Sequence, residues 1–168
     1  MPPIPVWVLS LFYWLHMLAT VTWVGSLVAI AVLVLPVAQK TLPSVEQLAF
    51  IKGIQQRLEP VAWFSIGILV VTGLFQMSSN PHYNGFLATS NQWSLAILTK
   101  HVLVILMIVV SAIYTWDVLP TIRRELLRPE KIDSARLAKL QKQETFLLRA
   151  NIVLAVLILA ATAVARAS

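Results

Sequence analysis

Three ionisable side chains lie inside long apolar stretches of the sequence, and they are the residues best suited to chemistry. They are His16, Lys100 and His101. An ionisable group inside a membrane span costs at least about 2.5–3.5 kcal/mol on insertion scales, so its presence indicates a partner or a function. A neutral imidazole can ligate haem iron or copper. A buried lysine can lose its proton and ligate iron, or keep it and pair with an anion.

The two histidines are predicted to lie at the same depth in the membrane. His16 follows the start of one apolar run by about ten residues, and His101 follows the start of another by about nine. At about 1.5 Å of rise per residue, both imidazoles lie roughly 13–15 Å below the same end of a helix bundle. Two imidazoles at one depth on two helices form the arrangement that holds a b-type haem in four-helix membrane proteins. The alternative is that each histidine hydrogen-bonds a neighbouring helix and binds nothing.

Helical spacing indicates which side chains surround these histidines. Thr20 and Trp23 share the face of His16, so a cofactor there would meet an aromatic wall and a hydroxyl. Lys100 lies about 100° around its helix from His101, so the two side chains point in different directions. Three roles for Lys100 stay open: reaching the lipid headgroups, pairing with a haem propionate or another anion, and ligating iron.

Other metal and catalytic chemistry has less support in the sequence. Thioethers and imidazoles suit Cu(I), but no Met-x-x-Met cluster occurs, so Met17, Met77 and Met107 are expected to fill the core. The chain has no cysteine, which excludes disulfides, thiolate zinc sites and covalently attached c-type haem. No Ser/His/Asp set, HExxH motif or Gly-rich phosphate loop occurs, and no catalytic residue is predicted.

The composition identifies the kind of protein that positions these residues. Of its 168 residues, 58% are hydrophobic and 12% charged, with a mean hydropathy of +0.80. A soluble domain has about 45–50% apolar and about 25% charged residues, so the apolar excess must face lipid. Four helices of about 20 residues nearly fill the chain, which excludes a large extramembrane catalytic domain. The net charge of +6 lies in loops beside apolar runs, so it indicates topology and anionic lipid, not nucleic acid.

The predicted fold is an all-α integral membrane protein, a four-transmembrane-helix bundle forming one domain over residues 1–168. Spans are expected at about residues 6–35, 59–78, 92–119 and 146–166. The first run has no basic residues before it and is too long for a cleaved signal peptide, so we expect it to remain as a span. An amphipathic helix over 44–58 is expected at the membrane surface before span 2. A basic cytoplasmic segment over 121–144 is expected before span 4, and Asn91 is expected to cap the third helix.

The distribution of Lys and Arg predicts the orientation. Both the loop after span 1 and the loop after span 3 are basic, whereas the loop over 78–91 contains neither residue. The positive-inside rule therefore predicts that both termini and the 78–91 loop lie on the non-cytoplasmic side. Arg57 and Glu59, at the cytoplasmic end of span 2, are expected to pair with each other or to meet headgroups.

Three segments resemble the membrane domain of the copper resistance D (CopD) family in its short stand-alone form. They are WLHMLATVTWVGSLVAIAVLVLP, RLEPVAWFSIGILVVTGLF and LTKHVLVILMIVVS, with His16, Trp23, Gly25, Pro36, Arg57, Gly73 and Lys100 as the resembling residues. The first-span His, the Trp-x-Gly and the late Lys are similar, more distantly, to HemJ-type protoporphyrinogen oxidases. These resemblances imply a bacterial plasma-membrane protein. The second implies His16 and Lys100 as haem b ligands.

The sequence thus predicts a CopD-like membrane protein that binds a b-type haem or copper in the outer half of its bundle. His16 with His101 or Lys100 would hold the cofactor, for electron transfer or metal handling. One alternative is a cofactor-free accessory subunit that packs in a larger membrane complex or a homo-oligomer through its small-residue surfaces. Another is a HemJ-like protoporphyrinogen oxidase, so enzymatic activity stays open.

Overall fold

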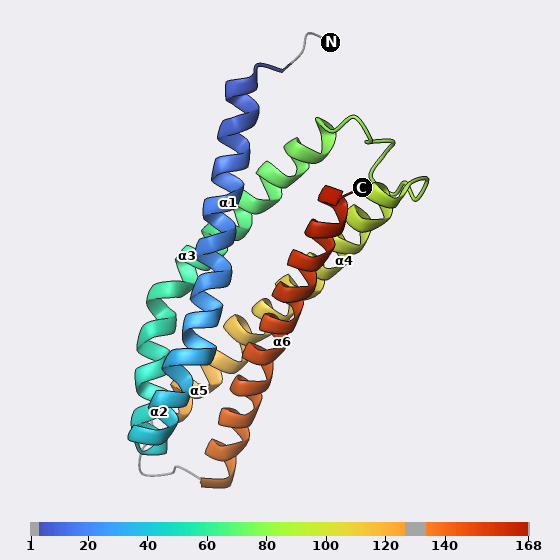
Figure 1. Cartoon of the computed structure of the whole chain (residues 1–168). Coiled ribbons are helices and arrows are strands. Elements are labelled where there is room, and N and C mark those ends of the chain that lie inside the picture. The colour runs from blue at the N-terminus through green and yellow to red at the C-terminus, as the bar shows by residue number, and fades with distance from the viewer. Residues whose placement is uncertain (1–3, 127–133, 168) are drawn as a thin grey trace.

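The computed structural model describes residues 4–126 and 134–167, and every regular element within them is a helix (Figure 1). Four stretches are long and apolar enough to cross a membrane, which confirms the predicted four-helix membrane bundle. In chain order the elements are α1 (Val6–Val28), the π-helical η1 (Ala29–Val34), α2 (Leu35–Thr41), α3 (Ser44–Ser78), α4 (Gln92–Ile113), the π-helical η2 (Tyr114–Val118), α5 (Leu119–Leu126) and α6 (Ser134–Ala167).

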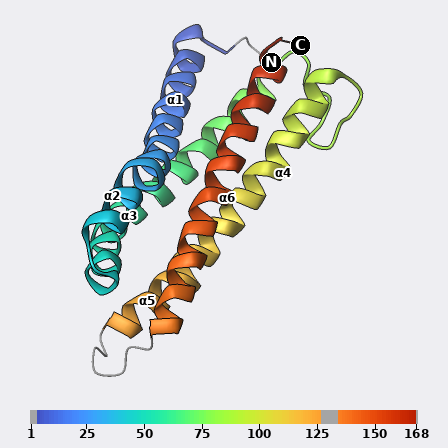
Figure 2. The ribbon, with the colours of Figure 1, turned by 60° about the horizontal axis from the view of Figure 1, so that its bottom comes forward.

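The helices form two antiparallel pairs. α1 packs chiefly on α3 and α4 chiefly on α6, while fewer contacts, mainly α1 with α6 and α3 with α5, join the pairs (Figures 1 and 2). The start of α1, the end of α6 and the 79–91 loop lie at the same end of the bundle, which we call the terminal end (Figure 1). At the opposite end lie α2, α5 and the start of α6. We call it the basic end, because it carries exposed lysines and arginines, among them Lys40, Lys142 and Arg124.

Two prolines explain the π-helical segments. Proline lacks an N–H and clashes with the carbonyl four residues earlier, which favours a widened, kinked or broken helix before it. For Pro36 that carbonyl belongs to Val32, inside η1, and for Pro120 it belongs to Trp116, inside η2. The chain widens to π geometry and then continues as α2 and α5. The helices are therefore longer than the apolar runs that predict the spans.

The amphipathic stretch before span 2 is helical, but it is not a separate surface helix. It forms the first part of α3, which runs without a break past Pro60. Leu48 and Ile51 on this stretch are almost completely buried, because the extended ends of the other helices cover them. The basic stretch before span 4 divides in the same way between α5 and the start of α6, and its residues 127–133 lie outside the described residues.

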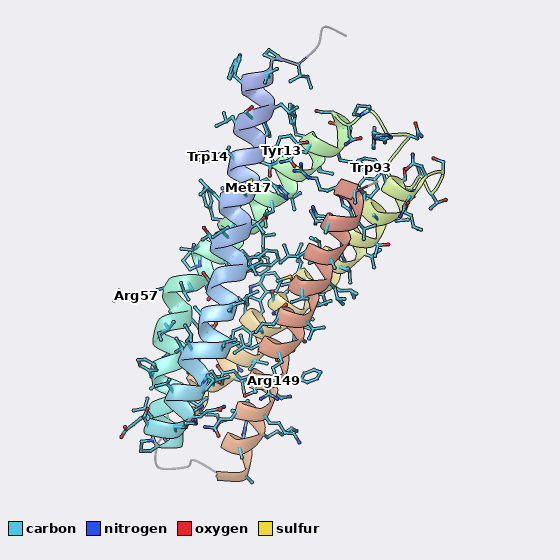
Figure 3. The ribbon with its side chains drawn as sticks, viewed as in Figure 1. Tyr13, Trp14, Met17, Arg57, Trp93 and Arg149 are labelled. Atoms are coloured by element: carbon cyan, nitrogen blue, oxygen red, sulfur yellow. The ribbon has the colours of Figure 1, made fainter. Side chains whose placement is uncertain are left out.

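The core lies in the middle and at the basic end of the bundle. The central cluster of buried side chains consists of Trp23, Ile66, Met107 and Ala155. Two further clusters lie toward the basic end. One consists of Leu48, Tyr114, Val118, Ile122 and Leu140, and the other of Ile30, Leu35, Ala38, Ile51 and Leu148. Large apolar side chains also point outward from all four long helices, where they contact the lipid bilayer. Figure 3 shows Trp14 and Met17 doing so on α1.

Asn91 caps the third long helix as predicted. Its side-chain oxygen accepts a 2.7 Å hydrogen bond from the backbone N–H of Ser94, one of the donors left unpaired at a helix start. The cap fixes where α4 leaves the 79–91 loop, and through this it sets the depth of Lys100 and His101.

Candidate functional site

His16 on α1 points at α3, and a threonine there determines which ring nitrogen carries the proton. His16 Nδ1 lies 2.7 Å from the hydroxyl oxygen of Thr72. That hydroxyl already donates its single proton to the carbonyl of Ile68, at 2.6 Å. The Thr72 oxygen must therefore accept from an N–H at Nδ1, because a hydroxyl has only one proton to donate. Nε2 of His16 is left with its lone pair.

A glycine on α3 makes room for the imidazole. A Cβ atom built at Gly73 would lie 3.4 Å from Cε1 of His16, in contact with the ring, so a side chain that branches or extends beyond Cβ would push against it. One turn toward the terminal end, the side-chain amide of Gln76 donates to the carbonyl of Phe12, at 3.1 Å. The rings of Phe12 and Phe75 stack there with their centroids 3.9 Å apart. His16 thus occupies a fitted position in the α1–α3 contact.

His101 on α4 is in the same protonation form as His16 but has different neighbours. Its Nδ1 lies 2.7 Å from the carbonyl oxygen of Ile97, and a carbonyl can only accept, so Nδ1 carries the proton. The ring meets Phe86 of the 79–91 loop edge to face, with centroids 5.1 Å apart. Within residues 4–126 and 134–167, no hydrogen bond reaches Nε2 of either histidine. Both rings therefore keep the nitrogen that a metal requires.

Two basic side chains from other helices lie near the neutral imidazole of His16. The charges of Lys100 on α4 and Arg166 on α6 both act on His16, and they also act on each other. The Arg166 guanidinium stands 5.0 Å over the ring of Tyr13, one turn from His16 on α1. We call His16, Lys100 and Arg166 the terminal basic cluster. No Asp or Glu occurs in α1, in α4, in α3 after Glu59 or in α6 after Glu144, so no carboxylate of these segments balances it.

The histidines and their predicted companions are not joined by a described contact. His16 binds α3, whereas His101 binds its own helix and the 79–91 loop. The hydroxyl of Thr20 donates to the backbone carbonyl of His16, at 2.8 Å, and so serves the helix itself. Trp23 is buried about two turns deeper than His16, against Ile66 and Met107.

The other candidate metal donors are the carboxylates and the methionines. No group of three or more His, Asp or Glu able to hold a metal occurs in the part of the chain that the structure describes. Met77 and Met107 are buried, as expected. For Met17 the expectation of core packing is wrong: its side chain is 63% exposed, because it lies on the outer face of α1 (Figure 3).

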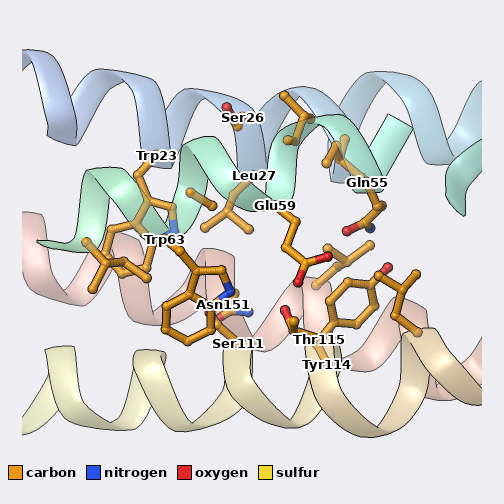
Figure 4. Close-up of a pocket in the computed structure, with 16 residues that line it drawn as sticks. Trp23, Ser26, Leu27, Gln55, Glu59, Trp63, Ser111, Tyr114, Thr115 and Asn151 are labelled. Carbon is orange, nitrogen blue, oxygen red and sulfur yellow. The ribbon is translucent and has the colours of Figure 1, made fainter. Parts of the chain in front are cut away.

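A second group of polar side chains lies toward the basic end, and the sequence analysis missed it. A cavity there is lined by Gln55 and Glu59 of α3, Tyr114 of η2 and Asn151 of α6, among others (Figure 4). Glu59 projects into this space while Arg57 is exposed, and no ion pair joins them within the described residues. The first of their two expected roles, pairing with each other, is therefore wrong, and contact of Arg57 with headgroups stays a prediction.

A signal for this polar group was present in the sequence. Residues 144, 148, 151 and 155 recur at the spacing of one helix face, and all four are buried in α6. Two of them, Glu144 and Asn151, are polar, which indicates a polar core.

One comparison with known proteins identifies a family. The family model described as Copper resistance protein D (CopD) matches residues 52–165, from within α3 nearly to the end of α6. No curated protein and no solved structure matches the chain. The matched range contains Thr72, Gly73, Lys100 and His101 and begins after His16.

Proposed function

This chain belongs to the copper resistance protein D (CopD) family, and from that premise we propose that it holds one redox cofactor near its terminal end, through Nε2 of His16. Membership makes it an integral membrane protein related to copper resistance. The cofactor is a b-type haem or a copper ion, and its role is electron transfer or metal handling.

The single observation that carries the proposal is the hydrogen bond between His16 and Thr72. Histidines that ligate metals almost always donate their second N–H to an oxygen, which fixes the ring orientation and makes the ligating nitrogen more basic. His16 has this arrangement, because the Thr72 oxygen accepts from Nδ1 and leaves the Nε2 lone pair available.

The second ligand is Lys100 or His101. Lys100 is favoured by proximity, since its charge acts on His16 across the bundle. His101 is favoured by chemistry, since its Nδ1 is also committed and its Nε2 is available. If His101 is the ligand, Lys100 and Arg166 would supply positive charge for the haem propionates.

The donor set fits haem better than a dedicated copper centre. Haem needs only axial ligands from the protein, because the porphyrin supplies four nitrogens. A copper centre built by the protein needs more donors, and no cluster of three or more His, Asp or Glu occurs among the described residues. A bound haem would supply one-electron transfer at the depth of His16. Membership of a copper resistance family is the argument for copper.

An absorbance spectrum of purified protein, with metal analysis of the same sample, tests the proposal. Protein from haem-replete cells is expected to show a Soret band that disappears in His16→Ala. His82→Ala is the matched control, since His82 is an exposed histidine of the 79–91 loop, and it is expected to retain the band. Stoichiometric copper that is lost in the same variant, without a Soret band, supports the copper version.

The outcome that contradicts the proposal is a colourless and metal-free wild-type protein. A cofactor-free accessory subunit would then remain, and it predicts co-purification with a larger membrane complex and no effect of His16→Ala. If haem is present, Lys100→Met and His101→Ala identify the second ligand, because only the ligand's removal changes the coordination spectrum. Growth of a strain that lacks protoporphyrinogen oxidase tests the HemJ-like alternative.

A further inference from the structure

The cavity toward the basic end has the size of a water site, and several polar side chains lie among its apolar lining. It lies among α1, α3, η2 and α6, in the half of the bundle away from the terminal basic cluster (Figure 4). The volume inside it that water molecules can occupy is about 60 Å³. A cavity needs only about 10–15 Å³ by this measure to hold one water molecule, so there is room for several.

Polar groups converge on this space from three sides. Gln55 and Glu59 project from α3, Ser111 and Thr115 lie on the α4–η2 stretch, and Asn151 lies on α6. Gln55 is only 8% exposed, and its side-chain Nε2 is buried without a hydrogen-bond partner among the described residues. A buried donor without a partner is costly, and a water molecule in the cavity would remove that cost.

Tyr114 connects the cavity to a buried acid. Its ring forms part of the cavity wall, and its hydroxyl donates a 3.1 Å hydrogen bond to Oε1 of Glu144. Glu144 is 1% exposed and does not line the cavity itself. Its Oε2 is buried and has no hydrogen-bond partner within the described part of the chain. Among the cavity's described polar groups, Tyr114 is thus the one that reaches both water and this carboxyl.

Glu59 marks the route from the cavity to the surface. Together with Thr115 and Leu119 it also lines a neighbouring groove, which Lys52 and Gln56 border. Besides Tyr114, the ionisable side chains that line this cavity and groove among the described residues are Glu59 and Lys52, both on α3. A carboxylate shared by an outer groove and an inner cavity can exchange protons with both.

We propose that this cavity is filled with water and that Tyr114 passes protons between that water and Glu144, which makes Glu144 a proton-binding site connected to the basic end. In the loading step, Tyr114 gives its hydroxyl proton to Oε1 of Glu144 and takes a proton from a cavity water. The hydroxyl is restored, Glu144 becomes neutral, and the water regains its proton through Glu59 from solvent. The step moves one proton and changes no oxidation state.

Infrared spectroscopy of the protein in lipid nanodiscs tests this proposal, and it needs no bound cofactor. The infrared C=O stretching band of a protonated carboxyl shifts in frequency when deuterium replaces the proton. The band that is missing from the spectrum of Glu144→Gln is assigned to Glu144. After a switch to D₂O this band is expected to shift quickly in wild type. In Tyr114→Phe the band is expected to shift about a hundredfold more slowly. This factor is the lower end of the rate effects seen when a positioned proton-transfer group is removed. Tyr83→Phe, in the 79–91 loop, is the control and is expected to exchange like wild type.

Two results would overturn the proposal: exchange in Tyr114→Phe as fast as in wild type, or no Glu144 band at any pH at which the protein stays folded. Should Glu144→Gln fail to fold, Glu144→Asp identifies the band by its change in frequency. Glu59→Gln gives an independent reading, because it keeps the side-chain shape while removing the proton carrier at the cavity mouth. Deuterium exchange of the Glu144 band in this variant is expected to be slower than in wild type. Exchange as fast as in wild type would show that the route through Glu59 is wrong. These results are separate from the cofactor spectrum, so either proposal can fail alone.

Discussion

At the scale of single residues, one hydroxyl on α3 fixes the tautomer of His16 and leaves Nε2 available for the proposed ligation. Thr72 cannot both donate to Ile68 and donate to His16, so the imidazole must present Nε2 as its lone-pair nitrogen. His101 reaches the same state through its own helix. The difference is that the partner of His16 is 56 positions away in sequence, so only the folded bundle can hold its ring.

Thr72→Val removes this acceptor while keeping the shape of the side chain. We expect the affinity for the proposed cofactor to fall by about 10–100-fold, the usual cost of losing an outer partner of a metal-ligating histidine. Titration of haem or copper into the cofactor-free protein measures the change.

Thr20→Val is the matched control for that experiment. It makes the same chemical change on α1, where the hydroxyl serves only the backbone carbonyl of His16. Equal losses of affinity in the two variants would contradict a role for Thr72 in preparing the ring.

The sequence could indicate His16 but not its partner. A histidine in an apolar run is visible from composition alone, because its cost inside a membrane demands an explanation. Which of several span hydroxyls it meets depends on how α1 rotates against α3, and side-chain packing sets that rotation. Glu144 was missed for a related reason: before the bundle is assembled, it is one polar residue within a basic stretch.

At the scale of helices, the α1–α3 contact depends on a glycine at the closest approach to the ring. A side chain at Gly73 meets His16, whereas one at Gly67, also on α3, meets nothing within 4 Å. The same substitution can therefore be made at both glycines, with contact to the His16 ring expected only at Gly73.

Gly73→Val is expected to displace the His16 ring, break its hydrogen bond to Thr72 and lower the melting temperature. The loss should be about 1–3 kcal/mol, the usual cost of overpacking. Gly67→Val is expected to change the melting temperature little. Thermal unfolding followed by circular dichroism, together with the cofactor spectrum, measures both variants. A greater loss in Gly67→Val would show that the ring does not pack against Gly73.

The helices themselves were predictable in kind and number, but not in length. Apolar runs and the Asn91 cap predict four spans and one exact start, because both are local features of the chain. The continuations beyond Pro36, Pro120 and Leu58 depend on partners from distant parts of the chain. Leu48 and Ile51, for example, belong to a helix within the bundle only because α2, α5 and α6 extend far enough to cover them.

At the scale of the whole molecule, charge separates the two ends. The terminal end holds a basic cluster on helical segments that contain no Asp or Glu, and the basic end combines surface lysines and arginines with the buried acid Glu144 and buried amides. The positive-inside rule predicts that the basic end faces the cytoplasm. The proposed proton site would then take its protons from the cytoplasm and the proposed cofactor would face the opposite side.

The absence of cysteine makes this orientation directly testable. Ser90→Cys in the 79–91 loop and Lys142→Cys on α6 each create a single reactive thiol at an exposed position. In intact cells, a membrane-impermeant maleimide is expected to label Ser90→Cys and to spare Lys142→Cys. Both should react after the cells are opened, and the reverse pattern in intact cells would show that the orientation is inverted.

The length of α3 bears on how the protein sits in its membrane. Its 35 residues measure about 52 Å at about 1.5 Å each, whereas the hydrocarbon layer is about 30 Å thick. A tilt of up to about 40° still leaves part of α3 outside the hydrocarbon layer, so the helices extend beyond that layer on the side of α2 and α5. A partner that approaches from that side meets a preformed helical surface. A binding protein raised against this surface would add a rigid mass that helps to image this small protein.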